Sequence, residues 1–315
     1  MYGRLRFIMR RHRHLNNNGR LRYVDLYMYR YFALLHRKIC ASLAALLVLA
    51  LFGAPELTPA ETTVADPLSG KLVITGASTL APLIAEIGKR FESLHAKVRV
   101  DVQTGGSSRG AADARQGLAD IGMVSRAMKE DQGDLHPFPV ARDGVCLIVH
   151  KENPVHALTD EQIVAIYTGR ITNWKAVGGK DATITVVNKA EGRSTLEVFL
   201  HYFKMKNTDV KAQVVIGDNE QGVKTVAGNR NAIGYVSIGT AEYDETQGVP
   251  IKLLPIGGIA ASSENVRKGT FPISRPLHIV TRTPPVGLAK TFIEYAQSKA
   301  VHDIITQQYF IPLAH

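Results

Sequence analysis

Cysteine is almost absent from this sequence, which contains only Cys40 and Cys146 among its 315 residues. Cys40 lies in an apolar run near the N-terminus that we expect to be removed, so Cys146 would stand alone and an internal disulfide is excluded. Cys146 lies within the apolar stretch 145–149, where a lone thiol is more often part of the core than reactive. Clustered Cys and His ligands, an HExxH helix and a nucleotide P-loop are missing too, so we expect no metal and no cofactor.

The chain after residue 60 also lacks a strong net charge, although the whole chain has a formal charge of +10. Residues 1–60 hold ten of the 38 Lys and Arg residues but two of the 28 Asp and Glu residues, which leaves a charge of +2 for the remainder. The basic character therefore belongs to the N-terminal region and not to a binding surface, which argues against a nucleic-acid partner. A transcription-factor effector domain is disfavoured because residues 1–60 lack a helix-turn-helix pattern.

The N-terminal region resembles an export signal. Arg37 and Lys38 precede an uncharged apolar run at Ile39–Phe52, which small residues follow. This run is shorter than the roughly 20 apolar residues of a membrane span, so a leader at 1–60, cleaved near Ala60, is favoured over a retained signal anchor. Met28 would make a better start than Met1, which suggests an over-extended N-terminus.

Cys40 precedes most of the apolar run, whereas a lipid-attachment cysteine would follow it. We therefore expect an exported, periplasmic protein without a lipid anchor, in which residues 61–70 form a polar linker.

A strand, a Gly/Ser loop and a helix follow one another at 98–117. Val98–Thr104 alternates apolar and polar residues like a strand, and the loop 105–108 then leads into a run of good helix formers that Gly117 ends. Ser107 and Ser108 could cap this helix or donate hydrogen bonds to a ligand. A short apolar strand at Ile121–Val124 then delivers Ser125 and Arg126 to its carboxyl end.

The same arrangement occurs at two other places. The strand Lys71–Thr75 is followed by Ser78, Thr79 and a helix whose apolar residues are spaced as on one helical face. The strand Thr183–Asn188 leads into the polar loop Lys189–Thr195 and another helix. Successive βαβ units favour parallel strands, whose carboxyl edge is where ligands gather.

Further elements are expected along the chain. We predict a polar connection at Lys129–Val140, strands at Gly144–His150, Ala232–Val236 and Leu277–Thr281, and helices from Thr159 to Tyr167, at Asp218–Ala227 and within Val286–Gln307.

Loops of this kind can bind an anion, because backbone N–H groups and the positive end of a helix point at one place. A single Gly/Ser loop is more often a plain helix cap, but three in one chain favour an oxyanion pocket. Arg126, Lys189 and Arg193 lie beside these loops and could form charge-assisted bonds to the anion, or could be solvated surface groups.

The segment 106–110 also matches G-x-S-x-G, the nucleophile elbow of serine hydrolases. That mechanism needs a histidine and an acid near Ser108, and no sequence motif identifies them. A secreted hydrolase remains an alternative, as does a scaffold or adhesion protein that reuses a binding fold.

Five segments together resemble the phosphate-binding proteins of Pst-type ABC importers. They are ITGASTLAPLIAEIGKRF, TGGSSRGAADARQGLADIGMVSR, ARDGVCLIVHKENPV, LTDEQIVAIYTGRITNW and NAIGYVS. The resemblance implies an α/β, two-lobed type II periplasmic binding protein fold, with mixed, mostly parallel sheets and helices on both faces. Lobe 1 would hold residues 71–143 and 278–315 and lobe 2 residues 144–277, with hinge crossings near Val140–His150 and Ser274–Thr281.

The resemblance implies capture of inorganic phosphate, or a related tetrahedral oxyanion, by a monomer that serves an inner-membrane permease without catalysis. The ligand-binding residues would be Ser78, Thr79, Ser107, Ser108, Ser125, Arg126, Lys189, Arg193, Ser194 and Thr195.

Two departures from the family pattern affect the choice of anion. Arg126 stands where relatives often carry an acidic residue, and Arg193 and Ser194 replace Ser and Gly in the loop Arg-x-x-Gly-Ser-Gly-Thr. Both changes add positive charge around the expected pocket. Glu191 or Asp143 could replace the missing acidic residue as a hydrogen-bond acceptor for the anion.

Overall fold

The strands of the computed structural model, which describes residues 68–313, are divided between two hydrophobic cores that share one long strand. The leader, the alternative start at Met28 and most of the expected linker lie outside the described residues. Gly70, the last residue of that linker, is already in the first strand. Among the described residues, no helix combines the length and the hydropathy that a membrane span requires.

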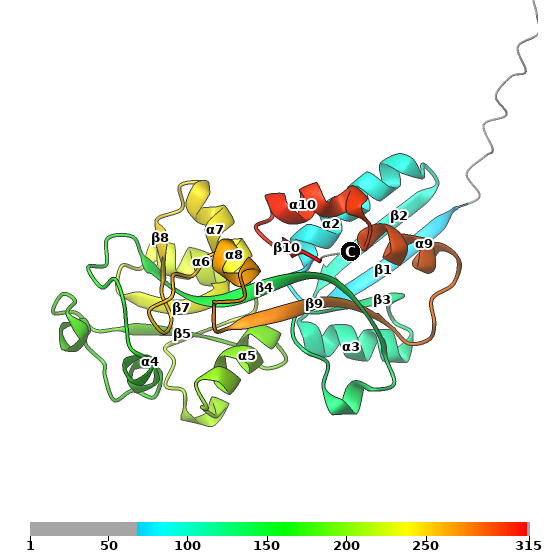
Figure 1. Cartoon of the computed structure of the whole chain (residues 1–315). Coiled ribbons are helices and arrows are strands. Elements are labelled where there is room, and N and C mark those ends of the chain that lie inside the picture. The colour runs from blue at the N-terminus through cyan, green and yellow to red at the C-terminus, as the bar shows by residue number, and fades with distance from the viewer. Residues whose placement is uncertain (1–67, 314–315) are drawn as a thin grey trace, which may run out of the picture. The chain divides into compact units, whose positions relative to one another are not determined.

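The strands and helices alternate over most of the described chain (Figure 1). The strands are β1 (Gly70–Gly76), β2 (Val98–Thr104), β3 (Ile121–Val124), β4 (His136–His150), β5 (Thr185–Lys189), β6 (Val214–Ile216), β7 (Ala232–Ser237), β8 (Ile251–Leu254), β9 (Ser274–Thr281) and β10 (Ile311–Pro312). The α-helices are α2 (Ala81–Leu94), α3 (Ser107–Gln116), α4 (Asp160–Tyr167), α5 (Ser194–Tyr202), α6 (Asn219–Gly228), α7 (Ile238–Thr246), α8 (Ser263–Arg267), α9 (Gly287–Ala296) and α10 (His302–Gln307). Short 3₁₀ turns lie at Glu130–Gln132, Trp174–Val177, Asn207–Asp209 and Lys299–Val301.

The sheet is mixed, and its order is β2-β1-β3-β9-β4-β7-β5-β6, with β8 and β10 also paired to β4. β1 pairs in parallel with β2 and β3, and β5 pairs in parallel with β6 and β7. Each antiparallel pairing between the described strands involves β4 or β9. The predicted βαβ units are thus present, and β4 and β9 connect them (Figure 1).

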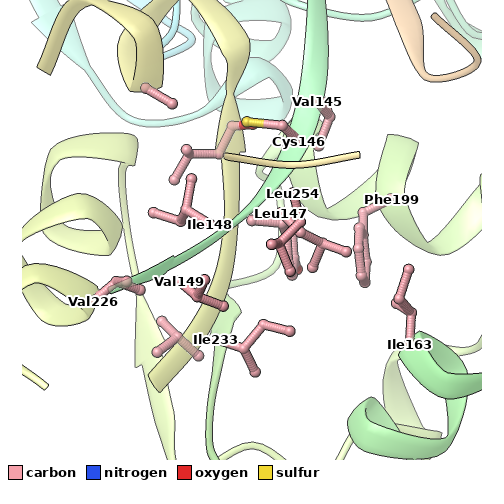
Figure 2. Close-up of a cluster of buried hydrophobic side chains, with 14 of the residues drawn as sticks. Val145, Cys146, Leu147, Ile148, Val149, Ile163, Phe199, Val226, Ile233 and Leu254 are labelled. Atoms are coloured by element: carbon pink, nitrogen blue, oxygen red, sulfur yellow. The ribbon is translucent and has the colours of Figure 1, made fainter. Parts of the chain in front are cut away.

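Two large clusters of buried apolar side chains form the interior. The first core takes its residues from 72–141 and 277–310, and the second core takes them from 145–273 together with Ile311. β4 belongs to both, because Val140 and Ala141 lie in the first core and Val145 to Val149 lie in the second (Figure 2). The lobe boundaries expected at 143/144 and 277/278 stay a prediction; Leu277 lies in the first core and Ile311 in the second.

Several elements follow directly from local sequence signals. Leu83, Ile84, Ile87 and Phe91 form the buried face of α2, as their helical spacing predicts. Thr159 forms a capping box at the start of α4, where its side chain accepts a hydrogen bond from the Gln162 backbone N–H.

The predicted connection at 129–140 is wrong in its second half, because β4 begins at His136 and not at 144. Pro137 and Pro139 suggested a loop, since proline cannot donate a ladder hydrogen bond. Both residues nevertheless pair with β9, next to an irregularity in the pairing between Pro139 and Ala141. β6, β8, β10, α7 and α8 were not predicted.

Candidate functional site

The three predicted loops meet at one small cavity. Its wall consists mainly of hydroxyl-bearing, cationic and small residues, namely Ala77, Ser78, Thr79, Gly106, Ser107, Ser125, Lys189, Arg193, Ser194, Thr195 and Gly217. Eight of the ten residues expected to bind the ligand therefore line it. A larger cleft of about 330 Å³ shares Ser78 with this cavity, but several of its lining residues are apolar.

Backbone contacts hold the first two loops together. The carbonyl of Gly76 accepts hydrogen bonds from the N–H groups of Gly105 and Gly106, both at 2.9 Å. Gly76 has φ +135°, and a Cβ atom there would lie 2.4 Å from the carbonyl oxygen of Met123. A glycine at this position allows β1, β3 and the loop after β2 to approach closely, which brings their polar residues to one sheet edge.

Neither serine of the second loop caps α3, contrary to one of the two roles expected for them. The N-cap is Gly106, and Ser107 is the first helical residue. The Ser107 hydroxyl instead accepts a hydrogen bond from the Ser125 backbone N–H at 3.1 Å. No side chain caps α3 and its first turn has no acidic residue, so the positive end of the helix remains available to an anion, although the Ser108 N–H already has a partner.

The third loop begins at Lys189, the last residue of β5. Its ammonium group is buried and donates to the carbonyl of Asp218 at 3.1 Å. Burial, and then the neighbouring charge of Arg275, lower the pKa of Lys189 from 10.5 to about 7. The lysine backbone N–H donates to the hydroxyl of Tyr235, whose ring stacks on Phe199 in the second core. The backbone of Lys189 is thus anchored to aromatic residues of the second core.

Arg193 crosses the cavity between the other loops. A Cβ atom at Gly106 would lie 2.9 Å from its Cδ, and one at Gly217 would lie 3.2 Å from its Nη2. The two glycines therefore leave room for the arginine, which with Lys189 provides the basic groups of the cavity wall.

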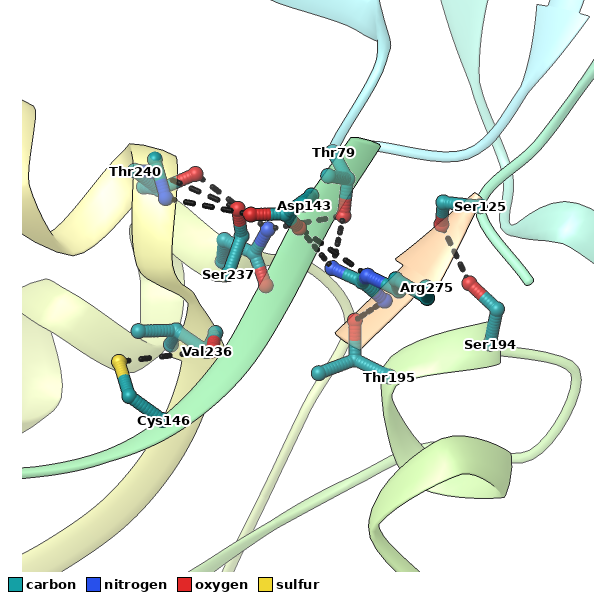
Figure 3. Close-up of polar contacts among 12 residues, drawn as sticks. Thr79, Ser125, Asp143, Cys146, Ser194, Thr195, Val236, Ser237, Thr240 and Arg275 are labelled. Carbon is teal, nitrogen blue, oxygen red and sulfur yellow. Dashed lines mark hydrogen bonds and ion pairs between the residues drawn. The ribbon is translucent and has the colours of Figure 1, made fainter. Parts of the chain in front are cut away.

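Polar contacts join the two cores around the cavity. The hydroxyls of Ser125 and Ser194 form a hydrogen bond (Figure 3). The Ser108 backbone N–H donates to the carbonyl of Gly192 at 3.2 Å. Asn219 donates to the hydroxyl of Thr79 at 3.1 Å. Each contact links a loop beside the first core to one beside the second.

Ser108 and Arg126 lie outside the cavity wall, at the same junction. The guanidinium of Arg126 is buried against Glu197, with Nε 2.9 Å from Oε2, and it donates to Gln132 at 2.9 Å. The Ser108 hydroxyl has Glu197 as its partner at 3.4 Å, a carboxylate where a serine nucleophile requires a histidine. A direct ligand contact for these two residues stays a prediction.

Sequence reasoning missed Arg275 and Asn219. Arg275 of β9 is buried and pairs with Asp143 of β4, with Nη2 and Oδ2 2.8 Å apart (Figure 3). Asp143 is thereby engaged, and Glu191 forms a hydrogen bond with Asn207, so neither suggested acceptor lies in the cavity wall. The one sequence signal for Arg275 was a charge inside an expected hinge strand.

Within the described residues, no group of three or more His, Cys, Asp or Glu side chains could hold a metal ion. The arrangement offers hydroxyl, amide and cationic donors around a space of small size. Such a set can neutralise and desolvate a small oxyanion.

Comparisons with known proteins agree with this chemistry. Residues 61–300 match the model of the PBP superfamily domain. The phosphate-binding protein PstS of Bacillus subtilis is 30% identical over 254 residues, which are 79% of this chain and 82% of the relative. A Clostridium perfringens structure, described as a phosphate ABC transporter substrate-binding protein with bound phosphate, has a TM-score of 0.73 and 31% identity over 78% of this chain and all of that one. An ABC-type phosphate transport receptor from Vibrio cholerae has a TM-score of 0.61 and 30% identity, with the same shares covered.

Proposed function

This chain belongs to the PBP superfamily, within the family of PstS phosphate-binding proteins, and from that premise we propose that it captures inorganic phosphate in the cavity between its two cores. It would act outside the cytoplasm and deliver the ion to the permease of an ABC importer. The observation that carries the proposal is that loops distant in sequence bring eight expected residues around one cavity.

Each part of the cavity has a role in binding. α3 and α5 both begin at the cavity wall, so the positive ends of these helices can stabilise an anion there by about 0.3–1 kcal/mol each. Hydroxyls of Ser78, Thr79, Ser107 and Thr195 can donate to the phosphate oxygens. Lys189 and Arg193 balance the remaining charge through charge-assisted bonds.

No step of this function needs a covalent bond to change. The protein binds, closes and releases, so it would act as a solute receptor and not as an enzyme. The small cavity, lined by polar and small residues, suits an ion of few atoms better than a large organic substrate.

Calorimetry of the purified chain with phosphate, sulfate and molybdate tests the proposal. We expect saturable heat and a rise in melting temperature with phosphate, since a ligand that binds only the folded state stabilises it. Thr195→Val should weaken binding, whereas Thr306→Val, at an exposed position on α10, should leave it unchanged. No heat and no thermal shift with any of the three anions at millimolar concentration would contradict the proposal and favour a scaffold role.

A further inference from the structure

Arg275 forms four hydrogen bonds to three side chains at the junction of the two cores. It lies in β9, and its side chain is 1% exposed. Its Nε and Nη2 donate to Oδ2 of Asp143 at 3.0 and 2.8 Å, its Nη1 donates to the hydroxyl of Thr195 at 3.0 Å, and its Nη2 also donates to the hydroxyl of Thr79 at 3.1 Å (Figure 3). Thr79 follows β1 and Thr195 begins α5, so one guanidinium group holds a residue from each side of the cavity.

These bonds decide what the two threonines can offer a ligand. A hydroxyl has one hydrogen and two acceptor lone pairs. The Thr79 oxygen accepts from both Arg275 and Asn219, so both of its lone pairs are used. The Thr195 oxygen accepts from Arg275. Because both threonines line the cavity, their hydroxyl hydrogens are left to donate into it.

We propose that Arg275 is the positioning residue of the site, which orients Thr79 and Thr195 as paired hydrogen-bond donors to the oxyanion and thereby joins anion binding to the approach of the two cores. This inference rests on the proposed function. Arg275 is not itself in the cavity wall, so it acts through the threonines and not by contact with the ion.

Arginine suits this role better than lysine. Its planar group presents five donors in a fixed geometry, which can reach a carboxylate and two hydroxyls at the same time. Asp143 balances its charge, so Lys189 and Arg193 are left as the cations of the cavity wall.

The experiment is a set of phosphate dissociation constants measured by calorimetry on the full chain. Arg275→Lys retains the positive charge but lacks the planar guanidinium group, so it cannot reach all the partners of Arg275. We expect it to weaken phosphate binding by about tenfold or more, the range of a lost charge-assisted bond. Thr79→Val and Thr195→Val should each weaken binding by at least about fivefold, and Thr79→Ser, which restores a hydroxyl, should return to within about threefold of the unmodified chain.

The combination of Arg275→Lys with Thr79→Val distinguishes positioning from a purely structural role. If arginine acts through Thr79, the double variant should bind no more than about twofold more weakly than Arg275→Lys alone, because the two changes remove one shared effect. Additive losses would overturn the inference, as would a lower melting temperature with an unchanged dissociation constant. The matched control is Arg90→Met. It removes an exposed guanidinium group that forms hydrogen bonds with Asp303, and it should leave the affinity for phosphate unchanged.

The inference can still be tested if a substitution at Arg275 prevents the chain from folding. Asp143→Asn combined with Arg275→Gln removes both buried charges together, which is less disruptive than leaving one unpaired, and should still lose about tenfold in affinity. If Arg275 variants do not fold, unchanged binding by either threonine-to-valine variant would overturn the inference. Failure of the unmodified chain to bind phosphate would instead contradict the proposed function itself.

Discussion

Arg126 and Glu197 form an ion pair across the junction of the two cores, between the end of β3 and the first turn of α5. The arginine side chain is 5% exposed and the glutamate side chain is 26% exposed. Lys129 also contacts Glu197 at 2.9 Å, but its side chain is 46% exposed. One carboxylate thus serves two cations on the opposite side of the junction.

Glu197→Gln should destabilise the fold, because it leaves the buried guanidinium of Arg126 without its anion. We expect a loss of about 1.5–3 kcal/mol, the value of a hydrogen bond to a charged group, together with weaker phosphate binding. Thermal unfolding and calorimetry measure both. Lys129→Ala is the control and should cost less than about 1 kcal/mol, as exposed pairs do. Equal effects of the two substitutions would contradict the assignment.

Phosphate binding should be accompanied by proton uptake at Lys189. Burial, Arg275 and Arg193 lower the pKa of Lys189 to about 7, while Asp218 opposes them. A bound anion favours the charged lysine and raises its pKa. Affinity should therefore fall as pH rises above about 7, by up to about tenfold per pH unit for one linked proton.

Measurements between about pH 8 and 9.5 isolate this effect, because the charge of phosphate is then nearly constant, its relevant pKa lying near 6–7. Calorimetry in buffers of different ionisation heat counts the protons directly. Lys189→Arg stays charged and should show a flat pH profile. In the ligand-free chain the sign is reversed: the folded state holds fewer protons than the unfolded state between pH 7 and 10.5, so this group adds stability as pH rises through that window.

Gly106→Ala should weaken phosphate binding more than it destabilises the fold. Gly106 has φ +93°, and its new Cβ would lie 2.7 Å from the carbonyl oxygen of Gly192, which belongs to the third loop. The clash therefore separates the loops that form the cavity, and we expect at least about a tenfold loss in affinity. Gly178→Ala is the control: φ is +82° and nothing lies within 4 Å, so about 1–2 kcal/mol of stability should be lost without a change in affinity.

Gly110→Ala should destabilise the first core. A Cβ there would lie 2.8 Å from the Cα of Gly76 and from the carbonyl oxygens of Thr75 and Met123, which are all backbone atoms that cannot rotate away. We expect a cost of at least about 1–3 kcal/mol, as for overpacked interiors. Gly228→Ala at the end of α6 meets nothing within 4 Å and should be neutral or slightly stabilising. Chemical denaturation compares the two.

Local signals explain which parts of the fold could be predicted. The apolar face of α2, the capping box at Thr159 and the end of α3 at Gly117 depend on residues within one or two helical turns. β8 and β10 instead exist because β4 offers them a partner, and α7 buries Gly239 and Asp244, so it has no clear apolar stripe. Neither the pairing of β8 and β10 with β4 nor the burial of Gly239 and Asp244 can be recognised from a short window of sequence.

The candidate site divides in the same way. The loops around Ser78, Ser107 and Ser194 could be predicted because each follows a strand and begins a helix, and strands that run in parallel bring such loops to one edge. Arg275 could not be assigned a role, since its partners Thr79, Asp143 and Thr195 are far from it in the sequence. The orientation of the Arg126 side chain likewise depends on its ion pair with Glu197, which lies in α5 and far from Arg126 in the sequence.

The division of residues between the cores has a consequence for biogenesis. The second core is encoded almost without interruption by residues 145–273, so nearly all of its side chains have been synthesised before β9 exists. The first core must wait for β9, α9 and α10, which come from the opposite end of the described chain. Nascent chains should therefore acquire protease resistance in two steps, with the central segment protected before the segment that precedes it.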